Sequence, residues 1–346
     1  MKHTFTRRTA LATGAAAAGL MFGTHPMTAH AWNPPDVWGA DFLPQWSPPE
    51  NVKRNLKPGK TPIRLCCTAY GLSNTDSANP AEQVKGIRDA GYTAAEAPYS
   101  DWRMMNDSEN RELQAALKQH DLLFYNIHVW TNIIHPDPEE RRVNQREVVH
   151  AIEMAEQVGI KFILTHTGSR SNGKPSIAHK LNWTKETWDM SVAALKQIIS
   201  DTAGSTVALA VEAVNTTNCN SPAAHVRLKR DVGSDRIKVT LDPTNMLYAG
   251  TVFRTTELLN ACFEIIEEDD IMYAHAKDVR WTEMLPGLTW VVPGQGEMDY
   301  ETYLTHLSRL RYPRPLMLEF LKRDQYPEAK RFIEETAAKV GVTIYS

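Results

Sequence analysis

The chain has 346 residues, which allows one large domain or two ordinary ones at roughly 100–200 residues per domain. Apolar residues make up 42% and charged residues 23%, values that exclude a disordered, collagen-like or disulfide-scaffold chain. The formal charge is −3, but residues 1–31 hold three basic and no acidic residues, so the rest carries 35 basic against 41 acidic residues. This acidic body excludes nucleic acid as the expected partner, because nucleic-acid binding needs a basic surface.

Residues 1–31 have the order of an export signal. The run TRRTAL at residues 6–11 precedes a weakly apolar stretch, and Ala29 and Ala31 form an Ala-x-Ala cleavage site. The stretch is shorter than the roughly 20 residues of a membrane span, so we expect no stable span. Paired arginines resemble a twin-arginine (Tat) signal, with an ordinary Sec signal as the alternative. We therefore expect the Tat translocase as a partner during export and a periplasmic or secreted protein.

Residues 32–58 are rich in tryptophan and proline and predict an extended N-terminal arm ahead of a single domain at residues 59–346. The chain has four cysteines, too few for a disulfide framework. Cys66 and Cys67 are neighbours in a predicted strand, so their side chains should point to opposite faces of the sheet.

From Pro62 onward, short apolar runs alternate with helical stretches. Helix starts follow from proline after a capping residue, as in Asp137-Pro138 and Ser221-Pro222, and helix ends from Gly91, Gly159 and Gly233. Apolar strands joined by crossover helices indicate a parallel sheet, and eight such units predict an α/β fold, a single-domain (β/α)8 TIM barrel. The eight predicted strands are 63–69, 92–97, 122–129, 162–166, 207–214, 237–242, 271–275 and 316–320.

A doubly wound open sheet is the alternative to the barrel. Such a sheet usually has a glycine-rich turn after its first strand, and residues 70–74 read YGLSN, which is no such turn. The sequence also has no P-loop and no G-x-S-x-G elbow.

Charged side chains end four consecutive predicted strands. The ends of parallel strands meet at one rim of a barrel, and a buried carboxylate is costly unless it is paired or binds a metal. We therefore predict a centre for one divalent metal ion. Its oxygen-rich ligands favour Mn²⁺, with Mg²⁺, Co²⁺ or Zn²⁺ as alternatives. The four residues are Glu212, Asp242, His275 and Glu319.

The runs VEAVN, LDPTN, HAKDV, PGQGEMDY and LEF, in this order, resemble the sugar isomerase/epimerase superfamily of xylose isomerase-like TIM barrels. That superfamily includes ketose 3-epimerases and inosose dehydratases, and the resemblance covers roughly residues 60–340. It implies that Glu212, Asp242, His275 and Glu319 are the metal ligands. It further implies that Glu212 and Glu319 exchange protons with a substrate carbon. Dimers or tetramers occur in such proteins, so a homo-oligomer is compatible with the resemblance, although no feature of the sequence indicates one.

The sequence departs from the ketose 3-epimerases at Asn218, where they have a glutamate, and at Asn245, where they have a histidine. We expect both residues in the substrate site. Lys277 is closer to the inosose dehydratase branch and is a candidate to bind a substrate oxyanion or to donate a proton; a structural pair with Asp278 or another acid is the alternative.

Further candidates lie at or just after predicted strand ends. We expect His128 and His166 to bind substrate hydroxyls, with His166 also as an acid or base, against the alternative of buried structural histidines. A weaker candidate is Glu96. The aromatic Trp130 and the cationic Arg280 are candidates to contact the substrate.

These features predict an exported, metal-dependent enzyme that moves a proton next to the carbonyl of a carbohydrate, as an isomerase or epimerase does. A lyase or dehydratase acting on inososes or 3-keto-glycosides would use the same chemistry, and the two asparagines favour it somewhat. A non-catalytic sugar-binding protein is the third reading.

Overall fold

The computed structural model describes residues 56–72, 80–98, 107–282 and 287–346. The predicted signal and nearly all of the predicted arm lie outside these residues. Within them, no helix combines the length and apolar content that crossing a bilayer requires. All four cysteines are free and buried.

Eight parallel strands form a closed barrel, because each pairs with the next one of the eight and β10 pairs back with β1. Each predicted run overlaps one of these strands, with ends that differ by at most two residues, so the predicted (β/α)8 architecture is confirmed and the open sheet is excluded. The strands are β1 (Ile63–Thr68), β2 (Ala94–Pro98), β3 (Leu123–His128), β4 (Phe162–Thr165), β5 (Ala208–Glu212), β6 (Ile237–Leu241), β7 (Ile271–Ala276) and β10 (Pro315–Leu318).

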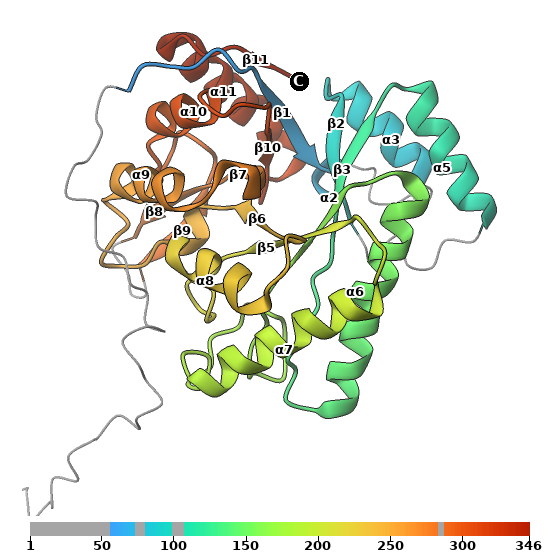
Figure 1. Ribbon diagram of the computed structural model, residues 1–346. Coiled ribbons are helices and arrows are strands. Elements are labelled where there is room, and N and C mark those ends of the chain that lie inside the picture. Colours follow the sequence, from blue (N-terminus) through green and yellow to red (C-terminus); the bar gives the residue numbers. More distant parts are fainter. Residues whose placement is uncertain (1–55, 73–79, 99–106, 283–286) are drawn as a thin grey trace, which may run out of the picture. The chain divides into compact units, whose positions relative to one another are not determined.

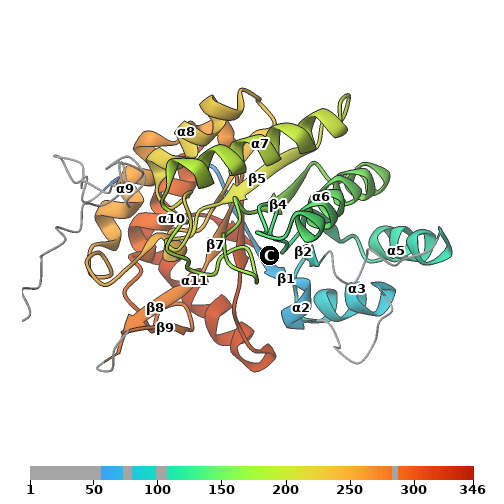
Figure 2. The same ribbon diagram turned by 90° about the horizontal axis from the view of Figure 1, so that it is seen from below.

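Helices surround the strands (Figures 1 and 2). The predicted caps are present: the carboxylate of Asp137 accepts two backbone N–H groups, Ser221 accepts one, and Gly159 and Gly233 end their helices in the left-handed conformation. The helices are α2 (Ala69–Leu72), α3 (Pro80–Asp89), α5 (Asp107–Gln119), α6 (Pro138–Val158), α7 (Lys185–Asp201), α8 (Pro222–Val232), α9 (Thr255–Ile265), α10 (Tyr300–Ser308) and α11 (Tyr326–Val340).

Two separate hydrophobic clusters show how the strands alternate. The larger cluster joins strands and helices and includes Leu316 and Leu318 of β10, whereas Met317 between them belongs to a smaller cluster inside the barrel. Cys66 and Cys67 divide in the same way, which confirms their opposite directions. Side chains of the smaller cluster fill the barrel below the site, so the centre is a packed core.

Three strands lie outside the predicted pattern. Strand β11 (Ile344–Tyr345) pairs with β1, and β8 (Asp278–Trp281) forms an antiparallel hairpin with β9 (Leu288–Val291) directly after β7. The carboxylate of Asp278 accepts backbone N–H groups of four residues and so ties this hairpin to the segment before α10. One donor is Gly296, where a Cβ atom would lie 2.2 Å from Asp278 Oδ1, so only glycine permits this close approach.

Candidate metal centre

The alternation of the strands carries the predicted ligands into the barrel. Ala210, Tyr273 and Met317 face the interior, and Glu212, His275 and Glu319 each come two residues later, so they face the interior at its rim. Asp242 follows β6 in the same way. All four side chains are at most 3% exposed.

The four side chains form what we call the Glu212 cluster: Glu212, Asp242, His275 and Glu319. One potential ligand atom from each lies within 4.8 Å of the other three. His275 Nδ1 lies 3.0 Å from Glu212 Oε1, 3.1 Å from Glu319 Oε2 and 3.4 Å from Asp242 Oδ2. Three carboxylates and one imidazole at this spacing fit a hard divalent cation, because such ions take oxygen and imidazole ligands at 2.0–2.6 Å.

Lys277 brings a second cation to this cluster. Its Nζ lies 2.7 Å from Asp242 Oδ2 and 2.7 Å from Glu319 Oε2, and the side chain is 3% exposed. Burial opposes the charge on the amine, but the surrounding carboxylates, Asp242 first, raise the pKa of Lys277 above its ordinary value. Lys277 therefore pairs with two acids of the cluster, as one of the predicted alternatives holds, while Asp278 is engaged with backbone groups.

Glu212 and Glu319 lie in contrasting surroundings. Burial favours the neutral form of both, but Lys277, His166 and His275 together hold the pKa of Glu212 well below its usual range. For Glu319 burial prevails and raises the pKa, although His275 and Lys277 oppose it. His166 contributes a contact of 2.9 Å between its Nε2 and Glu212 Oε2, while burial lowers the pKa of His166, so a neutral imidazole donates to the carboxylate.

A second group, the Glu96 cluster, lies beside the first and comprises Glu96, Asn126, His128 and Tyr273. Asn126 and Tyr273 donate to Glu96 Oε2 at 2.7 and 2.9 Å, and His128 Nδ1 lies 3.1 Å from Glu96 Oε1. Burial opposes ionisation of Glu96, yet His128 and His275 lower its pKa. All four residues of the Glu96 cluster lie on strands of the barrel.

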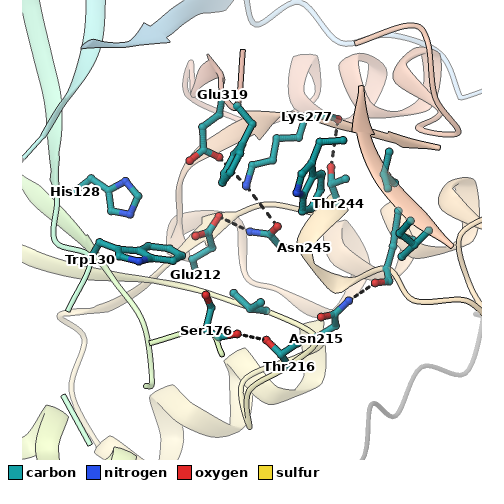
Figure 3. A pocket seen from close by; sticks show the side chains of 16 residues that line it. His128, Trp130, Ser176, Glu212, Asn215, Thr216, Thr244, Asn245, Lys277 and Glu319 are labelled. Atoms are coloured by element: carbon teal, nitrogen blue, oxygen red, sulfur yellow. Dashed lines mark hydrogen bonds and ion pairs between the residues drawn. The ribbon is translucent and has the colours of Figure 1, made fainter. Parts of the chain in front are cut away.

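A cavity of about 710 Å³ opens onto both clusters. Glu212, Glu319 and Lys277 point into it, with His128 and Trp130 on one side (Figure 3). Four of the predicted substrate residues line the cavity: His128, Trp130, Asn245 and Lys277. Asn245 donates to Glu212 Oε1 at 3.0 Å, so it supports a ligand of the predicted centre.

Four predicted substrate residues do not line the cavity: Glu96, His166, Asn218 and Arg280. Glu96 and His166 are fully buried. Asn218 is buried and donates to Ser191 of α7, and Arg280 is exposed on β8; neither lines the cavity. The backbone N–H of Val214 donates to Cys219 O and so closes a turn that contains Asn218.

Several lining residues were not predicted. Trp290 of β9 and Phe320 after β10 have stacked rings with centroids 5.6 Å apart, and both line the cavity. Phe320 has a φ of 59°, a left-handed conformation that is uncommon outside glycine and is often found at functional sites. Alternating polarity in residues 278–281 (DVRW) is a local signal for the first strand of the hairpin, whereas residues 288–291 (LTWV) do not alternate throughout. Nothing local marks the φ of Phe320. The remaining lining residues are Ser176, Val214, Asn215, Thr216, Thr244, Leu247, Val279 and Leu288.

Comparison with known proteins agrees with this architecture. Residues 84–336 match the family described as xylose isomerase-like TIM barrel. No protein of curated function matches the sequence.

Solved structures with the same fold cover most of the chain. One is a xylose isomerase-like TIM barrel protein from Mycobacterium smegmatis in complex with magnesium, 15% identical over 81% of this chain and 97% of that one, with a TM-score of 0.61. Another is the IOLI protein with a bound zinc atom, 18% identical over 80% and 98%, TM-score 0.61. A third is 3-keto-D-glucoside 4-epimerase from E. coli, 16% identical over 82% and 99%, TM-score 0.57.

Proposed function

The chain belongs to the xylose isomerase-like TIM barrel family, and from this premise we propose that it is a divalent-metal-dependent carbohydrate isomerase or epimerase. The observation that carries the proposal is the Glu212 cluster, in which three buried carboxylates and one imidazole converge at the floor of a cavity. Such a concentration of buried negative charge is costly unless cations balance it.

Glu212, Asp242, His275 and Glu319 would hold the ion. The oxygen-rich set favours Mn²⁺, and the magnesium and zinc in the two similar structures are in keeping with a divalent ion. A bound divalent ion polarises a carbonyl and a neighbouring hydroxyl, which acidifies the C–H bond between them.

The protein's own residues then supply the proton transfer. Glu212 and Glu319 reach the cavity from β5 and from the end of β10, so one carboxylate can take a proton from the substrate carbon and the other can return one. His166 fixes the orientation of Glu212 through Nε2. This contact limits rotation of one of the two carboxylates that exchange the proton.

Two imidazole nitrogens in the described part of the chain lack a partner, and His128, whose side chain lines the cavity, is suited to bind a substrate hydroxyl. His128 Nε2 and His166 Nδ1 are buried and have no hydrogen-bond partner among the residues that the structure describes. Their other ring nitrogens are bonded to Glu96 and Glu212, which fixes each ring. The Trp130 ring, with its centroid 4.6 Å from that of His166, adds an aromatic face on which a sugar ring can stack.

The test is a screen of ketoses, inososes and 3-keto-glycosides with Mn²⁺ in D₂O, read by mass and NMR. An isomer of equal mass with deuterium at the exchanged carbon supports the proposal. Asp242→Ala, which removes a proposed metal ligand and keeps both proton-exchanging carboxylates, should abolish turnover. Sugar binding that survives in Glu319→Gln, with no turnover by the wild type on any of these compounds, would instead show a non-catalytic binding protein.

A lyase is the second candidate, and the position of Lys277 favours it. Its ammonium lines the cavity 2.7 Å from Glu319, where a cationic donor can protonate the group that leaves after a proton is removed from the neighbouring carbon. The same screen separates the two candidates, because a lyase yields an unsaturated keto compound and a released group.

Export by the Tat pathway is proposed on the sequence alone, from the run TRRTAL at residues 6–11. Fractionation of cells that express the full chain or the Arg7→Lys, Arg8→Lys double variant tests it. Retention of the double variant in the cytoplasm, with export of the wild type, is the expected result; equal export of both would point to the Sec pathway.

A further inference from the structure

We propose that Lys277 is the resident cation of the Glu212 cluster in the metal-free protein, and that a divalent ion displaces its ammonium from Asp242 and Glu319 on binding. This rests on the metal centre of the proposed function. It assigns Lys277 an effect on metal affinity that its place two residues after a ligand does not by itself imply.

The ammonium and the metal ion need the same carboxylate oxygens. Nζ lies 2.7 Å from Asp242 Oδ2 and from Glu319 Oε2, the two oxygens that also face His275 Nδ1. The other oxygen of Asp242 is occupied by the backbone N–H groups of Thr244 and Asn245. Asp242 therefore offers one oxygen to a cation, and Lys277 holds it.

Electrostatic repulsion also prevents the ammonium and a divalent ion from sharing this site. Two positive centres in contact with one pair of oxygens repel each other strongly in a buried site, where the effective dielectric constant is far below that of water. Among the described residues in contact with these carboxylates, Lys277 is the one with a permanent positive charge, since His275 must be neutral to ligate a metal. Lys277 thus stabilises the metal-free cluster, and this stabilisation is lost when a metal ion binds and displaces the ammonium.

The displaced ammonium can stay beside the aromatic rings of the cavity wall. Nζ already lies 4.3 Å from the ring centroid of Phe320 and 5.4 Å from that of Trp290, both on the cavity wall. Aromatic faces attract cations at such distances. An ammonium that leaves the carboxylates keeps these rings as neighbours and remains at the cavity, so its displacement does not strand a charge in the apolar core.

The experiment measures Mn²⁺ affinity by calorimetry on chelator-treated protein, for the wild type, Lys277→Met and Lys277→Gln. We expect both variants to bind Mn²⁺ roughly tenfold or more tightly, because the competing cation is gone. The melting temperature of the metal-free variants should fall below that of the metal-free wild type, and saturation with Mn²⁺ should narrow the difference. If metal-free Lys277→Met does not fold, Lys277→Gln, which keeps a hydrogen-bond donor, supplies the comparison.

Lys238→Met is the matched control. Lys238 also pairs with a partly buried carboxylate, its Nζ lying 2.7 Å from Asp270 Oδ1, but outside the Glu212 cluster. It should lower the melting temperature with or without metal and leave Mn²⁺ affinity unchanged.

The outcomes are distinct. Equal or weaker Mn²⁺ binding by both Lys277 variants, with tight binding by the wild type, overturns this proposal and leaves the metal centre intact. Binding by the variants but not by the wild type supports it in its strongest form. Absence of binding by all proteins overturns the metal centre and this proposal together.

Discussion

The Glu96 cluster and the Glu212 cluster both contain glutamate and histidine but differ in what surrounds their carboxylates. Glu96 is a single acid bonded to an amide, a phenol and an imidazole. In the Glu212 cluster, three acids face one histidine, and Lys277 lies against two of these acids from outside the cluster. Glu96, His128 and Glu319 also bring ligand atoms within 4.8 Å of one another, but the Glu212 cluster has the larger excess of buried acids for a cation to balance.

The largest expected effect is on turnover. Glu212→Gln and Glu319→Gln should each lower kcat by roughly a thousandfold or more, because each removes a group that exchanges the proton. Glu96→Gln should lose much less, since Glu96 contacts its neighbours rather than the proposed reacting carbon. Steady-state kinetics on the substrate found in D₂O provides the measurement. An equal loss in Glu96→Gln would break the comparison and place Glu96 in the reaction.

Metal-dependent stability should separate the clusters next. Mn²⁺ at 100 times its dissociation constant stabilises the folded protein by about 2.7 kcal/mol if it binds only that state. Asp242→Asn should abolish the resulting rise in melting temperature, and Glu96→Gln should keep it. Scanning calorimetry with and without EDTA measures both. A rise retained by Asp242→Asn would mean that the ion binds elsewhere.

Glu96→Gln should nevertheless destabilise the fold. One carboxylate oxygen becomes an NH₂ group that faces donors, so the substitution leaves buried groups without acceptors at a cost of about 1–3 kcal/mol. Glu139→Gln is the control, because Glu139 forms an exposed ion pair with Arg142 that should be worth under about 1 kcal/mol. Urea unfolding at neutral pH gives the comparison; equal costs would show that the Glu96 bonds contribute little.

The smallest predicted effect concerns His225, a buried histidine outside both clusters. Burial lowers its pKa to about 4, so between that value and its ordinary pKa the unfolded chain binds a proton that the folded chain does not. Stability from this group is therefore present above pH 6.5 and lost as the pH falls toward 4, by about 1 kcal/mol between pH 6.5 and 5.5.

His225→Leu should remove that part of the pH dependence, measured as the free energy of unfolding in urea at the two pH values. If the difference between the wild type and the variant is the same at both pH values, the pKa of His225 does not differ between the folded and unfolded states. The test also sharpens the comparison, because a carboxylate partner raises the pKa of His128 where burial alone lowers that of His225.

Much of the fold follows from local patterns. Strand runs, proline after a capping residue, and glycine at helix ends are read within a few residues, and the eight strands and the caps at Asp137 and Ser221 agree with them. The hairpin β8–β9 was not predicted, because the loop after β7 that contains it has no counterpart in the repeating β/α unit. Its Trp290 therefore entered the cavity wall without a prediction.

The sequence by itself determined which side chains end the strands on the inner face, because the two-residue period of a strand sets that direction locally. Which side chains these residues contact depends on the tertiary structure alone. Lys277 pairs with Asp242 and Glu319 because β6 and β10 flank β7 in the closed barrel. Glu96 lies opposite Asn126 because the register between β2 and β3 shifts between Ala95 and Glu96. Such a shift arises from packing between strands, which no local pattern contains.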